Sequence, residues 1–156
     1  MVAGKMKVHY SSKTDNWATP QWLFDKLNAI YDFDLDVCAN SENAKFWRYY
    51  SPDDYGLKQT WTGRIWMNPP YGRTIGKWVK KAYQSAIDGS YVVALLPART
   101  DTKWFHDYIY GKPSVTVEFV KGRLRFGNST QSAPFPSMIV VFGSKPRQPW
   151  GAKLHG

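Results

Sequence analysis

Cysteine is almost absent from this sequence of 156 residues, in which Cys38 stands alone. A disulfide within the chain is therefore excluded, as is a zinc or iron–sulfur site built on several cysteines. The three histidines (9, 106 and 155) are scattered and lack the spacing of metal ligands, so we expect no metal. No apolar run reaches the roughly 18 residues of a membrane-spanning helix, and the first residues do not form a secretion signal. These absences predict a soluble cytoplasmic protein without a membrane partner.

Acidic residues are scarce in the second part of the chain. The whole sequence carries 21 Lys and Arg against 12 Asp and Glu, a net charge of +9. Residues 1–54 hold 6 basic and 8 acidic side chains, whereas residues 55–156 hold 15 and 4. Such a split favours a polyanionic partner such as a nucleic acid for the basic part. Aromatic residues make up 17% of the chain, which excludes a disordered basic tail.

The hydrophobic pattern predicts an α/β fold in a single domain. Apolar periodicity indicates helices over 20–30 and 75–87 and a third that Asp101 caps; Thr19 is the expected cap of the first, with Pro20 at its first position. Strands are expected at 33–38, 64–67, 91–96, 115–120 and 138–142, with a weaker one at 46–50. The alternation favours a mostly parallel sheet, with the last two strands forming an antiparallel edge. The length suits one domain over 1–156, with residues 1–11 and 144–156 as peripheral tails.

The most informative motif is Asn68-Pro69-Pro70-Tyr71, which follows the strand expected at 64–67. A rigid loop would explain the two prolines alone. A functional interpretation explains all four residues: the Asn68 carboxamide oxygen accepts one N–H of an exocyclic amine, and the backbone carbonyl of Pro69 accepts the other. The Tyr71 ring offers a face on which a base can stack.

This arrangement suits methylation of a base amine. The lone pair of such an amine is delocalised into the ring and is a poor nucleophile. Two acceptors that hold both N–H bonds favour pyramidalisation, so that the nitrogen can attack a positioned methyl sulfonium. The base has to leave the duplex to reach such a pocket.

Seven segments resemble, in this order, those of the phage-type (Dam-like) DNA N6-adenine methyltransferases. They are WATPQWLFDKL, LDVCAN, PDDYGL, IWMNPPYG, LLPARTDTKWF, FVKGRLRFG and APFPSMIVVF, and they span about residues 12–143. The resemblance implies a compact Rossmann-like S-adenosylmethionine-dependent methyltransferase fold without a separate target-recognition domain. It implies methyl transfer from S-adenosylmethionine to N6 of adenine in DNA, in the host cytoplasm if a phage or prophage encodes the chain.

The resemblance also assigns residues to the cofactor, and some of them have simpler structural interpretations. Asp36 could instead face solvent on a strand, Thr19 could only cap a helix, and an aspartate at 53 or 54 could only shape a turn. The Gly-x-Gly loop of the wider superfamily is missing, with Ala39 and Asn40 in its place. The implied cofactor-binding residues are Thr19, Pro20, Asp36, Cys38, Ala39, Asn40, Asp53, Asp54 and Asn68, and the implied catalytic residues are Asn68, Pro69, Pro70 and Tyr71.

A third group of residues is assigned to DNA. Apart from Thr100 its members are basic or aromatic, and all of them lie in connections between expected elements: Tyr71, Arg73, Arg99, Thr100, Lys121, Arg123, Arg125 and Phe135. Helix capping, a solvated charged edge and core packing are the competing interpretations. Cytosine-N4 or RNA adenine methylation, and a non-catalytic DNA-binding role, remain alternative functions. The recognition sequence, and whether the protein is a monomer or a homodimer, stay open.

Overall fold

A five-stranded sheet forms the centre of the protein in the computed structural model, which describes residues 17–40, 42–127 and 129–143. The tails expected at 1–11 and 144–156 lie outside these described residues. In chain order the elements are α2 (Gln21–Tyr31), β1 (Leu35–Asp36), the 3₁₀-helices η1 (Pro52–Asp54) and η2 (Gly56–Lys58), β2 (Arg64–Met67), α3 (Ile75–Ile87), β3 (Tyr91–Pro97), α4 (Lys103–Tyr108), β4 (Val115–Phe119) and β5 (Ser137–Phe142).

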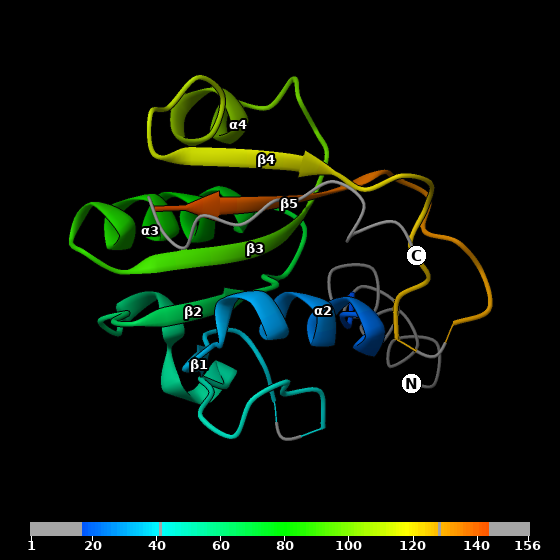
Figure 1. Ribbon diagram of the computed structural model, residues 1–156, viewed down its shortest axis with the longest axis horizontal. Helices are drawn as coiled ribbons and strands as arrows, with labels where there is room; N and C mark the ends of the chain where they lie inside the picture. The colour runs from blue at the N-terminus through cyan, green and yellow to red at the C-terminus, as the bar shows by residue number, and fades with distance from the viewer. Residues whose placement is uncertain (1–16, 41, 128, 144–156) are drawn as a thin grey trace, which may run out of the picture.

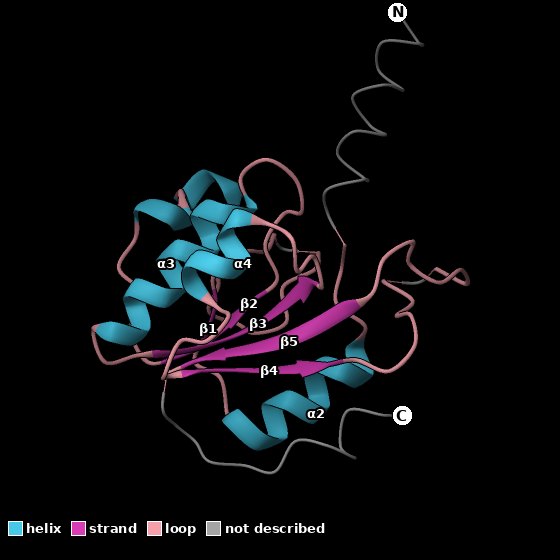
Figure 2. Cartoon of the chain, turned by 90° about the horizontal axis from the view of Figure 1, so that it is seen from above, coloured by secondary structure: helices cyan, strands magenta, loops and turns pink. Residues whose placement is uncertain are grey.

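Helices cover both faces of the sheet. Figure 2 shows α2 on one face and α3 with α4 on the other. The apolar stripe of α2 buries Leu23 and Leu27, and that of α3 buries Val79 and Ala82. Because each helix hides one apolar face, the sheet between them is sealed on both sides.

The strand order is β1-β2-β3-β5-β4 (Figure 1), and it corrects the expected sheet. β1 with β2 and β2 with β3 pair in parallel over two and four residue pairs. β3 with β5 and β4 with β5 pair antiparallel over six and five. The expected mostly parallel sheet is therefore wrong, because β5 also pairs antiparallel with β3 inside the sheet. The expected antiparallel pairing of the last two strands at one edge is confirmed.

Burial explains this order. All six residues of β5 are buried, as an interior strand requires, whereas β4 exposes Thr116 and Phe119 and suits an edge. β5 runs antiparallel to both β3 and β4, so β4 ends, and β5 begins, at the end of the sheet where β1, β2 and β3 end. The connection over 120–136 therefore lies at that end. This connection thereby joins the loops that carry the candidate site.

Several element boundaries differ from the prediction. β1 covers two residues rather than 33–38, and the segment expected as a strand at 46–50 makes only one isolated parallel bridge, between Asp36 and Tyr49. Pro20, not Thr19, takes the N-cap position of α2, without a side-chain capping bond. At α4 the cap is Thr102 rather than Asp101, since its hydroxyl accepts from the amide of Phe105.

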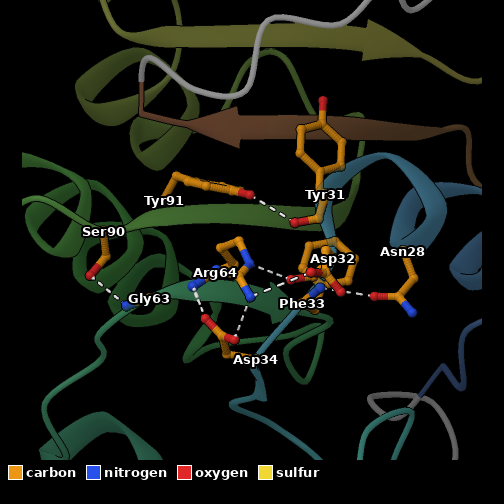
Figure 3. A network of polar contacts seen from close by, with 9 residues as sticks. All are labelled: Asn28, Tyr31, Asp32, Phe33, Asp34, Gly63, Arg64, Ser90 and Tyr91. Carbon is orange, nitrogen blue, oxygen red and sulfur yellow. Dashed lines mark hydrogen bonds and ion pairs between the residues drawn. The ribbon is translucent and has the colours of Figure 1, made fainter.

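A polar network ties the opposite edge of the sheet together, where β1, β2 and β3 begin (Figure 3). The Arg64 guanidinium lies 2.8 Å from Asp34 and 3.5 Å from Asp32. The Tyr91 hydroxyl donates to the carbonyl of Tyr31 at 2.8 Å. These ion pairs are partly exposed and contribute little to stability individually. They fix the start of the strands and place acidic side chains away from the edge described next.

Candidate active site

A cleft of about 450 Å³ opens at the carboxyl ends of β1 and β2. Its walls come from the segment before α2, the loop after β1, the two 3₁₀-helices and the loop after β2. Parallel strands end at one edge of the sheet, which brings these loops together. Eight of the residues assigned from the sequence line it: Thr19, Asp36, Cys38, Ala39, Asn40, Asn68, Pro69 and Pro70.

Asp36 is a buried carboxylate in the cleft wall. It is only 2% exposed, so the solvent-facing interpretation is wrong. One of its oxygens accepts from the amide of Cys38 at 3.2 Å and the other from the amide of Lys45 at 3.1 Å. Burial raises the pKa of Asp36 to about 6, against the lowering effect of these amides and of the Lys45 charge. At neutral pH the site thus holds a largely ionised acceptor for a cation.

The loop after β1 is built around Asn40. Its side-chain oxygen accepts from the amides of Glu42 and Asn43, and the Asn43 oxygen accepts from the amide of Asn40. These turns deliver the Lys45 amide to Asp36. The Asn40 side-chain oxygen is therefore engaged in shaping the loop. Burial, together with the nearby Asp36 charge, raises the pKa of the Cys38 thiol to about 12, which keeps it neutral.

Asn68 has a donor that is fully engaged and an acceptor that is not. Its Nδ2 donates to the carbonyl of Trp17 at 2.5 Å and to Oγ1 of Thr19 at 2.9 Å. Its Oδ1 is buried and has no hydrogen-bond partner among the described residues. An unsatisfied buried acceptor costs about 1–3 kcal/mol, so its retention at a cleft points to a ligand that donates a hydrogen.

The structure corrects the expected exposure of Tyr71. Its ring is 2% exposed, its hydroxyl donates to the carbonyl of Leu95 at 3.0 Å, and burial raises its pKa well above the usual range. Phe126 and Phe135 pack edge-on against the ring, with centroids 6.4 and 5.6 Å away. Core packing, one of the alternatives for Phe135, describes both phenylalanines here. Tyr71 presents no open face for stacking in this conformation.

Asp53 and Asp54 do not line the cleft, although Ser51, Pro52 and Tyr55 around them do. Both aspartates are exposed. The Asp54 carboxylate accepts from the amide and hydroxyl of Ser51 at 2.8 and 3.0 Å and thereby caps η1. The turn interpretation thus describes Asp54. Pro20 is buried and also lies outside the cleft lining.

The basic candidates and Thr100 lie at the same end of the strands as the cleft and are not part of its lining. Six of the residues assigned to DNA are exposed: Arg73, Arg99, Thr100, Lys121, Arg123 and Arg125. They lie in the loops after β2 and β3 and in the 120–136 connection, which Figure 1 shows in yellow to orange beside the blue start of α2. Within that connection Leu124 and Phe126 point into the core, so the intervening cations face outward. We call these exposed cations (Arg73, Arg99, Lys121, Arg123 and Arg125) the basic rim.

Sequence reasoning missed a group of cleft residues that are aromatic or basic: Trp17, Lys45, Tyr50, Tyr55, Lys58 and Trp78. Only Tyr55 lies in a turn that the sequence marks, directly before Gly56. Its left-handed φ of 52°, which non-glycine residues rarely adopt, is visible only in the structure. The others reach the cleft through tertiary packing, for which the chain has no short-range pattern.

The described residues hold neither a candidate metal site nor a helix that could span a membrane. No group of three or more His, Cys, Asp or Glu is placed to hold a metal ion there. No helix within residues 17–40, 42–127 and 129–143 is both long and apolar enough to cross a membrane.

Comparison with known proteins gives one consistent family. Residues 7–151 match the family model described as DNA N-6-adenine-methyltransferase (Dam). The DNA N-6-adenine-methyltransferase of Haemophilus phage HP1 (strain HP1c1) is 34% identical over 149 residues, which cover 90% of this chain and 84% of that protein. The DNA N-6-adenine-methyltransferase of Escherichia phage T1 is 36% identical over 94 residues, 58% of this chain and 39% of that protein.

Proposed function

Because the chain belongs to the DNA N-6-adenine-methyltransferase (Dam) family, we propose that it transfers a methyl group from S-adenosylmethionine to N6 of adenine in DNA. The observation that carries this proposal is Asn68 Oδ1, a buried acceptor without a partner on a residue that lines the cleft. An adenine amine, which donates two hydrogens, is the substrate group that would satisfy it.

The residues of the cleft fit the cofactor. Its volume of about 450 Å³ lies within the usual range for small-molecule sites. The buried Asp36 carboxylate suits the ammonium of the methionine part, and the backbone at Ala39 and Asn40 forms the adjoining wall. S-adenosylmethionine supplies an electrophilic methyl group when it is bound. Asp53 and Asp54 are left out of this assignment, because neither lines the cleft.

The chain's own contribution to the reaction is to hold the amine. Asn68 Oδ1 accepts one N–H and the Pro69 carbonyl accepts the other, which localises the nitrogen lone pair toward the methyl group. Pro70 stiffens the loop that carries these acceptors. For Tyr71 to stack on the flipped base, the phenylalanines at 126 and 135 have to move away from its ring, since they pack against it now.

The basic rim is the proposed path of the DNA backbone. It surrounds the cleft edge, whereas the Asp32 and Asp34 carboxylates lie at the opposite edge (Figure 3). We assign β1, β2 and β3 to the cofactor-binding half of a Rossmann-like fold in one domain. We assign sequence specificity to the loops at 72–76 and 121–137. Since the substrate is DNA, we expect the enzyme to act in the cytoplasm.

The test is transfer of a labelled methyl group. The protein is incubated with methyl-labelled S-adenosylmethionine and unmethylated duplex DNA, and the DNA is digested to nucleosides. The expected result is label in N6-methyl-2′-deoxyadenosine. Label in N4-methylcytosine, or only in an RNA substrate, would overturn the assigned base or nucleic acid. Cofactor binding without any transfer would instead indicate a non-catalytic DNA-binding protein.

A further inference from the structure

The side chain of Asn68 is held in one of its two possible orientations by residues about fifty positions earlier in the chain. An asparagine amide can turn over and exchange its oxygen with its NH₂ group, and only one orientation leaves an acceptor for a substrate amine. In the structure Nδ2 faces the Trp17 carbonyl and Thr19 Oγ1. A carbonyl oxygen can only accept, so it selects the nitrogen. The oxygen is left as the unpartnered atom.

Thr19 is available for this contact because it does not cap α2. The N-cap position is taken by Pro20, whose carbonyl accepts from the amides of Leu23 and Phe24. Thr19 itself is only 4% exposed, and its hydroxyl meets the Asn68 amide at 2.9 Å. The buried Thr19 hydroxyl makes no capping bond to α2 and instead accepts a hydrogen bond from Asn68, in the loop after β2.

The segment that carries Thr19 is itself fixed from the other side. The Ala18 carbonyl accepts from the amide of Gly127 at 2.8 Å. The Trp17 ring packs edge-on against Phe126 and Phe135, with centroids 5.4 and 5.1 Å away. Residues 17–19 therefore stand between the 120–136 connection and Asn68, and their position is set by packing that a single side chain cannot change.

We propose that Thr19 is a positioning residue: its hydroxyl accepts from Asn68 Nδ2 and so keeps Asn68 Oδ1 presented to the substrate amine. This role rests on the proposed function and differs from a contact between Thr19 and the cofactor. Positioning acts on the transfer step, whereas a cofactor contact acts on cofactor affinity.

Thr19→Val removes the acceptor and keeps the shape, and Thr19→Ser restores the hydroxyl. We expect Thr19→Val to lower kcat for methyl transfer roughly 3- to 10-fold, the usual effect of one neutral hydrogen bond, with the cofactor Kd unchanged. Thr19→Ser should recover most of the rate. Thr116 is an exposed threonine of β4, so Thr116→Val is the matched control and should behave like the unaltered protein.

A second readout needs neither cofactor nor DNA. In protein labelled with ¹⁵N-asparagine, the Asn68 side-chain amide is assigned by the resonances that disappear in Asn68→Ala. Thr19→Val should shift one of its two protons upfield and speed its exchange with solvent, and Thr19→Ser should reverse both changes. Unchanged amide resonances, or a weaker cofactor Kd with an unchanged kcat, would overturn the positioning role. Absence of methylation by the unaltered protein would overturn the proposed function, while the amide readout would still report on the contact.

Discussion

Asp36 carries a charge into the protein interior at the carboxyl end of β1. Thr19, Ser85 and Ser137 are also buried polar side chains of the described residues, but none of them ionises in the physiological range. Two backbone amides from the loop after β1 support the carboxylate, yet burial still raises its pKa to about 6. The group is therefore poised to respond to a cationic ligand or to pH.

The affinity for S-adenosylmethionine should fall about tenfold between pH 7 and pH 5. Below a pKa of about 6 the Asp36 carboxyl is mostly neutral and no longer attracts an ammonium group, while above it the carboxylate is charged. Calorimetric titration across this range measures the change. Asp36→Asn should bind weakly at every pH; an affinity of the unaltered protein that is flat from pH 5 to 7 would contradict the assignment.

The Asp36 carboxyl should also affect the pH dependence of folding stability in the protein without its cofactor. Its folded pKa is raised above the unfolded value, so its stabilising contribution is complete below about pH 4 and is lost as pH rises through about 6. Urea unfolding should show Asp36→Asn losing this part of the pH dependence. An identical pH profile for the two proteins would indicate that the Asp36 pKa does not differ between the folded and unfolded states.

Single residues of the site differ in how far the sequence reveals them. Asn68 and its prolines form a local motif, and Asp36 lies in the alternating segment 33–38, so the sequence could single out both as candidates; both line the cleft. The contact between Asn68 and Thr19 could not, because the two residues lie 49 positions apart and meet only through packing. The burial of Tyr71 could not be predicted for a related reason: the phenylalanines that bury it come from the distant 120–136 connection.

At the scale of elements, the 3₁₀-helix η2 forms one wall of the cleft by approaching β1 very closely. A Cβ on Gly56 would lie 2.7 Å from the Val37 carbonyl oxygen and 3.2 Å from the Trp78 ring. The backbone oxygen cannot retreat without moving the strand. Glycine is thus required by contact distance, and its replacement should push η2 away from the sheet.

Gly56→Ala should lower the free energy of unfolding by about 1–3 kcal/mol, the usual effect of overpacking, and should weaken cofactor binding. Urea denaturation and cofactor titration measure the two effects. Gly76→Ala in α3 is the control, because a Cβ there meets Trp104 at an ordinary 3.6 Å and helix propensity favours alanine. Equal free energies of unfolding for the two variants would show that η2 can move away from Val37 without loss of stability.

Element identities and the antiparallel pairing of the last two strands were predictable, whereas the position of β5 next to β3 was not. β2 ends at Met67, since the two prolines that follow Asn68 cannot continue a ladder, and α3 stops before Gly89; both boundaries agree with the sequence pattern. The place of β5 between β3 and β4 depends on which strand covers which edge. That choice is made by the burial of whole strands, and no local pattern encodes it.

At the scale of the whole molecule, topology sorts charge between the two edges of the sheet. The loops after β2, β3 and β4 bring exposed cations to the cleft edge. The other edge carries Asp32 and Asp34 around Arg64. The charged side chains are therefore unevenly distributed between the two ends of the strands, which the net charge of +9 alone does not show.

Each exposed cation of the 120–136 connection that contacts a phosphate should contribute about 0.9 to the salt dependence of DNA binding. Arg125→Gln should reduce the slope of log affinity against log salt by about that amount in an anisotropy titration. Lys112→Gln is the matched control, since Lys112 precedes β4 at the opposite edge. Equal slopes for both variants would place the DNA elsewhere.

In the proposed mechanism, the central group is Asn68 Oδ1, the acceptor of the adenine amine. The most direct measurement is the single-turnover rate of methyl transfer to duplex DNA by Asn68→Ala, with cofactor affinity measured beside it. Loss of a preorganised hydrogen-bonding group that acts in the transition state typically costs 10²–10³ in rate, and that loss is predicted here with an unchanged cofactor Kd. A rate within a few fold of the unaltered protein would contradict the account.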